Sequence, residues 1–128
     1  EAMTYAAPPK EPEHQQIEPS ADPVLARMGQ IMSDNIAVPL PLPDIANTLN
    51  LSLKQLRLRS QRGLGVTPSA YYHHLRLQAA LDLVRATQIP MTEIAEATGF
   101  ATLASFSKSF RAEFQASPRK FRAGLARR

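Results

Sequence analysis

The side chains best suited to chemistry are the cationic and amide groups near the start of one expected helix, Lys54, Gln55 and Arg57. Lys and Arg donate hydrogen bonds to O6 and N7 of guanine, and Gln pairs with N6 and N7 of adenine. About fifty residues later comes a second set that is small and poor in long donors: Leu103, Ala104, Ser107 and Lys108. In that set we expect Leu103 and Ala104 to contact thymine methyl groups. The rest of the recognition there would rely on phosphate contacts and duplex shape.

A further set of side chains is suited to binding phosphate. It comprises two hydroxyls at expected helix starts and six basic residues: Ser52, Arg59, Arg62, Thr102, Arg111, Arg119, Lys120 and Arg122. Several members also have a plainer interpretation. Ser52 with Gln55 has the spacing of a helix capping box, Thr102 could be only an N-cap, and Arg57, Arg59 and Arg62 could be ordinary solvated charges. The sequence leaves these alternatives open.

The charge of the chain is divided sharply along its length. Residues 1–51 contain two Lys or Arg against seven Asp or Glu, whereas residues 52–128 contain 13 against four. This division concentrates positive potential on the second part of the chain, which suits a polyanion such as nucleic acid. A solvated basic surface with no ligand is the alternative interpretation of charge alone.

Enzymatic chemistry finds little support in the sequence. The absence of Cys excludes a disulfide scaffold and any thiolate metal site. His73 and His74 are neighbours that diverge by about 100° on a helix, which is a poor geometry for a metal or catalytic site. We therefore expect no enzyme activity and no cofactor or metal. No apolar run approaches the roughly 18 residues of a membrane span, and no signal peptide opens the chain, so we expect a soluble, cytoplasmic protein.

The strongest pattern in the chain is an internal repeat. Asp44-Ile45-Ala46 matches Glu93-Ile94-Ala95 at an offset of 49 residues, and Leu64-x-x-Thr67-Pro68 matches Phe114-x-x-Ser117-Pro118 at an offset of 50. One residue is therefore inserted in the second copy. Each copy consists of a short helix (about 43–49 and 92–98), a turn with Asn or Gly, and a second helix that begins after Ser52 or Thr102. This order predicts two helix-turn-helix units.

The segments before the first unit have distinct compositions. Residues 1–21 are rich in Pro, Glu and Gln, which favours a disordered linker, with a remnant of cloning as the alternative. Asp22-Pro23 is expected to cap and begin a helix that continues to about residue 35. The stretch 37–43 is not expected to be helical, because three prolines alternate through it.

A long helix is expected to bridge the two copies. It begins at Thr67-Pro68, ends near Ala86 and would be about 28 Å long, which could hold two recognition helices near the ~34 Å spacing of successive major grooves. A final helix is expected from Ser117 to about Leu125. The fold class is thus all-α, with about seven helices. The expected division is a first unit with the bridging helix at 22–86 and a second unit with the C-terminal helix at 87–128.

These residues resemble a known family. The run RLQAALDLVRATQIPMTEIAEATGFATLASFSKSFRAEFQASPRKFR (76–122) is similar to the signature of the AraC/XylS family of bacterial transcription regulators. The resemblance implies a seven-helix domain whose third and sixth helices enter adjacent major grooves. Tyr71-Tyr72 and Arg76-Leu77 also resemble members that have a glutamine-amidotransferase-like N-terminal sensor domain. Such a domain would precede this chain.

Two positions depart from the family pattern. Ser60 stands where the family has a large apolar residue that anchors the recognition helix, and Phe110 occupies the equivalent position in the second copy. Gln115 stands where Gly usually ends the sixth helix. A missing Phe costs on the order of 1–3 kcal/mol of burial unless neighbours fill the space, and a non-glycine cap is mildly strained.

The resulting hypothesis is a sequence-specific regulator of transcription. Its partners would be a double-stranded DNA operator and, if it activates, RNA polymerase, with no membrane partner. The alternative is a non-specific architectural nucleic-acid binder, or a protein-interaction module, with the same fold. An enriched binding motif would distinguish the hypothesis from this alternative.

Overall fold

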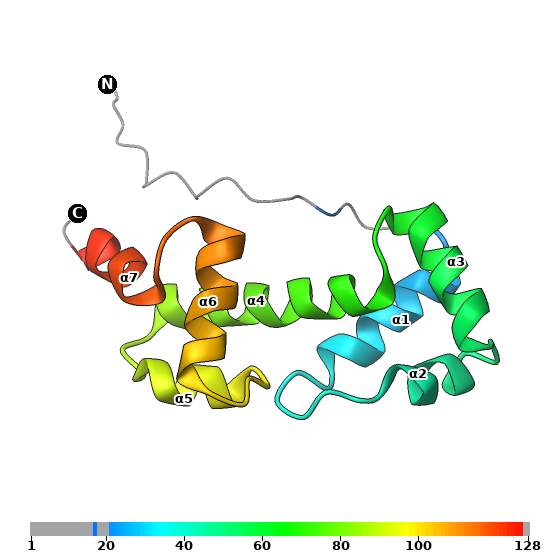
Figure 1. The fold of residues 1–128 in the computed structure, drawn as a ribbon, viewed down its shortest axis with the longest axis horizontal. Coiled ribbons are helices and arrows are strands. Elements are labelled where there is room, and N and C mark those ends of the chain that lie inside the picture. Colours follow the sequence, from blue (N-terminus) through cyan, green and yellow to red (C-terminus); the bar gives the residue numbers. More distant parts are fainter. Residues whose placement is uncertain (1–16, 18–20, 127–128) are drawn as a thin grey trace, which may run out of the picture. The chain divides into compact units, whose positions relative to one another are not determined.

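The structure, a computed structural model, describes residue 17 and residues 21–126, with side chains up to residue 124. The expected linker over residues 1–21 therefore lies outside the described residues, apart from residues 17 and 21. The described part of the chain is all-α and forms seven helices, shown in Figure 1: α1 (Pro23–Ser33), α2 (Leu42–Thr48), α3 (Leu53–Leu64), α4 (Pro68–Ala86), α5 (Met91–Ala97), α6 (Leu103–Phe114) and α7 (Pro118–Ala126).

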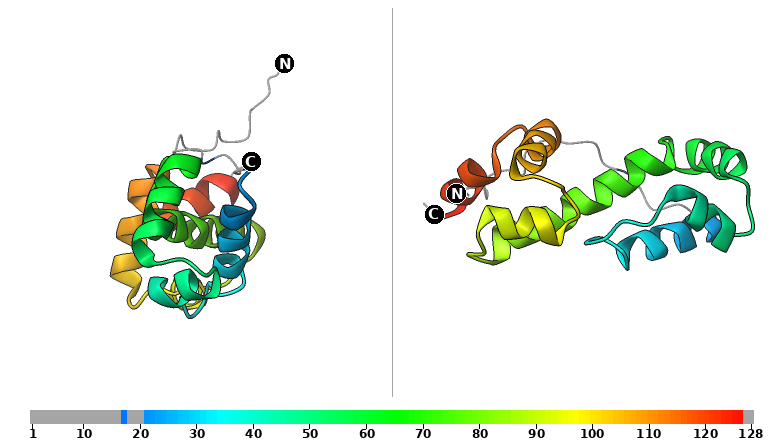
Figure 2. Two further views of the ribbon diagram at one scale, coloured as in Figure 1. Left: turned by 90° about the vertical axis from the view of Figure 1, so that its right-hand side faces the viewer. Right: turned by 60° about the horizontal axis from the view of Figure 1, so that its bottom comes forward.

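The chain divides into two compact units. The first unit ends at Gln78 and contains α1, α2, α3 and the first half of α4, and the second unit begins at Ala79 and contains the rest of α4 with α5, α6 and α7. In the second unit, α5, α6 and α7 gather around the C-terminal half of α4 (Figure 2). The boundary falls inside α4, whereas the sequence predicted a first unit that includes the whole bridging helix.

The helix starts follow from local chemistry. Asp22 caps α1, and its carboxylate accepts a hydrogen bond from the backbone N–H of Val24 at 2.9 Å, as expected. The expectation for 37–43 was wrong at its end, because α2 begins at Leu42 and Pro43 lies at its second position. Proline is tolerated there because the first N–H groups of a helix have no partner within the helix.

The first unit has a core of aliphatic and methionine side chains. Seven buried residues from all four of its helices form it: Leu25, Met28, Met32, Ile45, Ala46, Leu56 and Tyr72. The Tyr72 hydroxyl accepts a hydrogen bond from the N–H of Leu40 at 2.9 Å and donates one to the carbonyl of Asn35 at 2.5 Å. This tyrosine therefore ties the segment between α1 and α2 to α4.

The core of the second unit combines aliphatic side chains of α4 and α5, among them Leu81 and Ile94, with phenylalanines of α6 and α7. Phe106, Phe110 and Phe114 are fully buried along one face of α6, with ring centroids 5.7 and 4.6 Å apart. Phe121 of α7 packs edge-on against Phe110 at 6.1 Å. Tilted and edge-on contacts of this kind stabilise aromatic pairs beyond the area they bury, so α6 is held along its whole length.

The two units repeat each other in backbone detail. In the turn between α2 and α3 the N–H of Leu51 donates to the carbonyl of Ala46, and in the turn between α5 and α6 the N–H of Phe100 donates to that of Ala95, both at 2.9 Å. Asn50 and Gly99, at the same repeat position, have φ of 59° and 81°. Asn and Gly enter this left-handed region at the lowest cost. The predicted repeat and its turn chemistry are confirmed.

No helix in the described ranges combines the length and the apolar character needed to cross a membrane.

Candidate nucleic-acid interface

The second helix of each unit starts at a side-chain cap. The Ser52 hydroxyl accepts a hydrogen bond from the N–H of Gln55 at 3.0 Å, and the Gln55 side-chain carbonyl accepts one from the N–H of Ser52 at 2.8 Å. In the second unit the Thr102 hydroxyl accepts from the N–H of Ser105 at 3.0 Å. Of the alternatives left open by the sequence, the capping box at Ser52 and the N-cap at Thr102 are both present.

Helix α3 contains the first group of base-contact candidates, and it has one buried face and one solvent-exposed face. Leu56 and Ser60 are buried on the inner face, while Lys54 and Arg57 are exposed, as expected. Leu58 is also exposed, with 48% of its surface accessible. A residue at this position is about 200° from Leu56 around the helix, which places it on the outer face.

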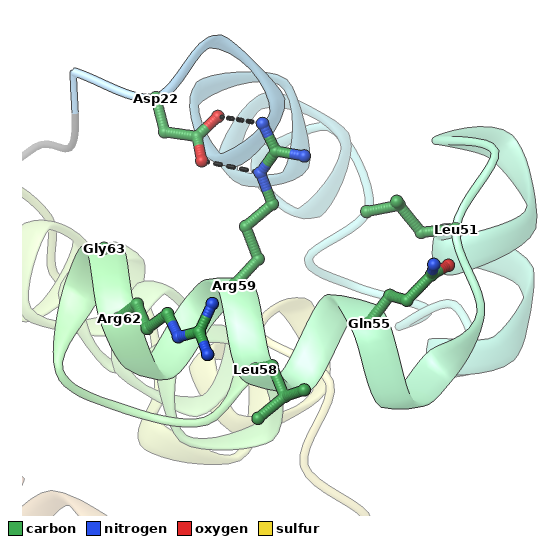
Figure 3. A pocket seen from close by; sticks show the side chains of 7 residues that line it. All are labelled: Asp22, Leu51, Gln55, Leu58, Arg59, Arg62 and Gly63. Carbon is green, nitrogen blue, oxygen red and sulfur yellow. Dashed lines mark hydrogen bonds and ion pairs between the residues drawn. The ribbon is translucent and has the colours of Figure 1, made fainter.

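A shallow depression of about 490 Å³ lies on this outer side of α3 (Figure 3). Its lining mixes charged, polar and apolar side chains: Asp22, Leu51, Gln55, Leu58, Arg59, Arg62 and Gly63. Two predicted phosphate ligands, Arg59 and Arg62, and one predicted base reader, Gln55, therefore share one surface. The depression also contains Leu58 and Asp22, which are not among the residues predicted to contact DNA.

The outer face of α6 is smaller and less charged. Leu103, with 38% of its surface accessible, Ala104 and Lys108 are exposed, and Ser107 is half-buried. A second depression, of about 230 Å³, brings together side chains from α5, α6 and the start of α7: Met91, Leu103, Ser107, Arg111, Ser117, Pro118 and Arg119. Two predicted base-contact residues and two predicted phosphate ligands thus lie around one surface of the second unit.

Arg59 is engaged within the protein and is not simply solvated. Its Nε donates to Asp22 Oδ2 at 2.7 Å and its Nη2 to Asp22 Oδ1 at 3.3 Å (Figure 3). The hydrogen bond from Arg59 lowers the pKa of the Asp22 carboxyl below its ordinary value, and the same bond raises the pKa of Arg59. As a phosphate ligand, Arg59 would first have to leave this carboxylate.

The guanidinium of Arg122 is bonded to the backbone of its own unit. It donates to the carbonyls of Val84 at 3.1 Å, Ile89 at 2.7 Å and Leu83 at 3.3 Å. These carbonyls belong to the end of α4 and the segment before α5, and that of Leu83 also accepts from the N–H and the hydroxyl of Thr87. The residue therefore caps α4 from α7, and as a phosphate ligand, the role predicted for it, it would have to give up some of these bonds.

The other basic candidates remain at the surface. Exposed side chains are found at Arg62, Arg111, Arg119 and Lys120. Their roles, and those of the base-contact candidates, stay predictions. Among the described residues no group of three or more His, Cys, Asp or Glu could hold a metal ion.

Arg122 stands at the repeat position that Tyr72 occupies in the first unit. It lies 50 residues after Tyr72, and its acceptors Val84 and Ile89 lie 49 residues after Asn35 and Leu40, the partners of the Tyr72 hydroxyl. Each of these two side chains hydrogen-bonds the segment before the helix-turn-helix of its own unit, one through a hydroxyl and the other through a guanidinium. No comparable local pattern connects Asp22 with Arg59, which are 37 positions apart.

Comparison with known proteins agrees with this architecture. Residues 45–124 match the family described as "Helix-turn-helix domain". The regulator GbdR of Pseudomonas aeruginosa (strain UCBPP-PA14) is 35% identical over 102 residues, which cover 80% of this chain and 28% of GbdR. The activator RhaS of Enterobacter sp. (strain 638) is 37% identical over 102 residues, covering 77% of this chain and 37% of RhaS. The chain thus spans about a third of the length of these curated relatives.

Solved structures give the same result. A transcriptional regulator of the AraC-type DNA-binding class from Chromobacterium violaceum is 36% identical and superposes with a TM-score of 0.78. The match covers 81% of this chain and 93% of that regulator's chain. The DNA-binding domain of AdpA, solved with a target DNA, shares the fold at 22% identity and a TM-score of 0.77, over 84% of this chain and 97% of its own. The chain therefore belongs to the AraC family of helix-turn-helix transcription regulators, as a DNA-binding domain.

Proposed function

We propose that this domain binds one asymmetric site on double-stranded DNA and that α3 and α6 each read one of two consecutive major grooves. The observation that carries the proposal is that both units expose the same face of their second helix, and that the side chains on this face differ between the units. Lys54 and Arg57 lie on that face in α3, and Ala104 and Lys108 lie on it in α6. Because the faces differ, the two halves of the site differ, and a single domain needs no palindrome.

The two units divide the work unequally in this proposal. In α3, Lys54 and Arg57 donate to guanine, while Gln55 contributes less than expected because its side-chain carbonyl is used in the capping box. In α6, Leu103 and Ala104 contact thymine methyls, and Ser107 and Lys108 add polar contacts. Phosphates are bound from both units by N-cap hydroxyls and basic side chains: Ser52, Arg62, Thr102, Arg111, Arg119 and Lys120.

The proposal extends to partners beyond this chain. The curated relatives are longer than the matched region, which supports a further domain that senses an effector and mediates dimerisation. The likeness of Tyr71-Tyr72 and Arg76-Leu77 to one branch of the family supports a glutamine-amidotransferase-like sensor. An activator of this kind would also contact RNA polymerase, and binding to a bacterial chromosome would take place in the cytoplasm.

Selection of bound sequences from a random duplex library, at near-physiological salt, tests the proposal. We expect enrichment of one asymmetric motif with two blocks about one helical turn, 10–10.5 base pairs, apart. Tight binding without any enriched motif would favour the architectural alternative. Enrichment of a single block would contradict reading by both helices.

A further inference from the structure

The ion pair between Asp22 and Arg59 joins the first residue of the folded domain to its recognition helix. Asp22 is the N-cap of α1, and its two carboxylate oxygens accept from Arg59 of α3 at 2.7 and 3.3 Å. The same carboxylate also accepts from the N–H of Val24. One acidic side chain therefore caps one helix and holds an arginine of another.

This ion pair lies on the rim of the depression that marks the outer side of α3. Arg59 reaches from α3 toward the start of α1 in Figure 3, and Arg62 and Leu58 line the same depression. The guanidinium of Arg59 is not withdrawn into the core, because 44% of its side chain is accessible. Arg59 lies one turn after the base-contact candidate Gln55 in the same depression, and it is already bonded to a carboxylate.

A phosphate approaching this rim would meet two opposing influences. Arg59 and Arg62 attract it, and Asp22 both repels it and competes for the Arg59 guanidinium, since carboxylate and phosphate accept from the same fork of N–H donors. An exposed ion pair contributes little to stability, so the fold does not depend on it. Its larger effect is on the number of phosphate charges that this rim can neutralise.

We propose that Asp22 is an intramolecular counter-anion that restrains Arg59 and lowers the sequence-independent affinity of this domain for DNA. The proposal rests on the DNA binding proposed above, but it concerns phosphate alone and needs no operator. Loss of the Asp22 charge releases Arg59 to bind one additional phosphate. The restraint lowers the affinity for any duplex by the same factor and leaves the base contacts untouched, so the ratio of operator to non-specific affinity stays the same.

Asp22→Asn is the informative variant, because asparagine caps helices as well as aspartate and keeps an acceptor for Val24. Binding to the selected operator and to an unrelated duplex of equal length is measured by fluorescence anisotropy at 50, 100 and 200 mM salt. Each phosphate neutralised adds about 0.9 to the slope of log affinity against log salt. We expect that increase for both duplexes, so the advantage of the variant grows about 3.5-fold from 200 to 50 mM salt.

Two further variants separate a local from a general charge effect. Asp44→Asn makes the same change in net charge at an exposed position in the first turn of α2, and we expect a clearly smaller change of slope. In Asp22→Asn with Arg59→Gln the gain should disappear. Thermal unfolding of each variant shows that the fold is retained.

The outcomes separate this inference from the proposed function. An unchanged slope in Asp22→Asn, an equal gain in Asp44→Asn, or a gain that survives Arg59→Gln would overturn the counter-anion role. If the wild-type domain binds the two duplexes equally while Asp22→Asn still steepens both slopes, specific recognition fails and the counter-anion role stands. If the wild type binds no duplex at 50 mM salt, both fall.

Discussion

Gly65 and Gln115 occupy the same left-handed helix cap in the two units. Gly65 ends α3 with φ of 76°, and Gln115 ends α6 with φ of 58°. A residue with a side chain pays roughly 1–2 kcal/mol in this conformation, whereas glycine does not. The Gln115 amide recovers a little of that cost through two long bonds, at 3.3 Å, to the carbonyls of Ala112 and Glu113. The cap of α6 is therefore strained, as its sequence indicated.

Gln115→Gly should raise the free energy of unfolding by about 0.5–1 kcal/mol, because relief of the left-handed strain exceeds the entropy that glycine adds to the unfolded chain. Gly65→Gln is the matched opposite change, and it should destabilise by a similar amount. A Cβ at position 65 would meet nothing within 4 Å, so its cost is in the backbone alone. Urea unfolding of both variants checks this, and changes of the same sign would refute the explanation.

A single base-reading side chain should affect specificity more than general affinity. Arg57→Ala is expected to cost about 1–3 kcal/mol on the selected site and to relax the preference at one position. Arg62→Ala is the control, since loss of a phosphate contact weakens binding to all sequences and reduces the salt slope by about 0.9. Repeating the library selection with each variant gives the comparison. Equal weakening of all sequences by Arg57→Ala would contradict its base-reading role.

At the scale of the element, each unit fastens the segment before its helix-turn-helix with one side chain. In the first unit the Tyr72 hydroxyl bonds the carbonyl of Asn35 and the N–H of Leu40, and in the second the Arg122 guanidinium bonds the carbonyls of the equivalent residues, Val84 and Ile89. A neutral hydroxyl can both donate and accept, but a guanidinium only donates. The second unit therefore satisfies carbonyls alone.

Removal of either fastening should destabilise the domain without removing a phosphate contact. Tyr72→Phe and Arg122→Met are each expected to cost about 1–3 kcal/mol, because buried or half-buried backbone groups lose their partners. Arg122→Met should lower the melting temperature and leave the salt slope of DNA binding near that of the wild type. Lys120→Met, which removes an exposed charge from the same helix, should do the reverse. A flatter salt slope of DNA binding in Arg122→Met would support the predicted contact of Arg122 with phosphate.

The elements themselves could be predicted from the sequence because their signals are local. Asp22 followed by proline, Ser52 with Gln55, and the turn residues Asn50 and Gly99 act within a few positions of the chain, and each formed the structure it predicted. The partners of Arg59 and Arg122 could not be predicted in the same way. They lie 33–39 positions away along the chain, so only the folded packing brings them together.

Ser60 shows the same limit within the first core. Its small polar side chain predicted a loss of buried apolar surface at the position that Phe110 occupies in the second unit. The structure buries Ser60 fully and satisfies its hydroxyl, which donates to the carbonyl of Val66 at 2.7 Å. A buried hydroxyl with a partner avoids most of the cost of desolvation. The bond ties α3 to the segment before α4.

At the scale of the whole molecule, the chain has two cores of different composition joined through one continuous helix. The core without phenylalanine holds α3, and the core that contains the phenylalanines holds α6. Each recognition helix thus depends on its own set of buried side chains. We therefore expect damage to one core to act mainly on the half of the DNA site that its own helix reads.

Phe106→Ala and Leu56→Ala test this independence at equivalent repeat positions, since both side chains are fully buried. Phe106→Ala should destabilise the second unit by about 3–5 kcal/mol and Leu56→Ala the first by about 2–5 kcal/mol. Hydrogen exchange should then show protection lost in α5 and α6 for one variant and in α2 and α3 for the other. In the library selection each variant should lose a different block of the motif. Loss of protection throughout the chain in both variants would mean that the units fold as one cooperative body, and a shared loss of both blocks would then follow from folding alone.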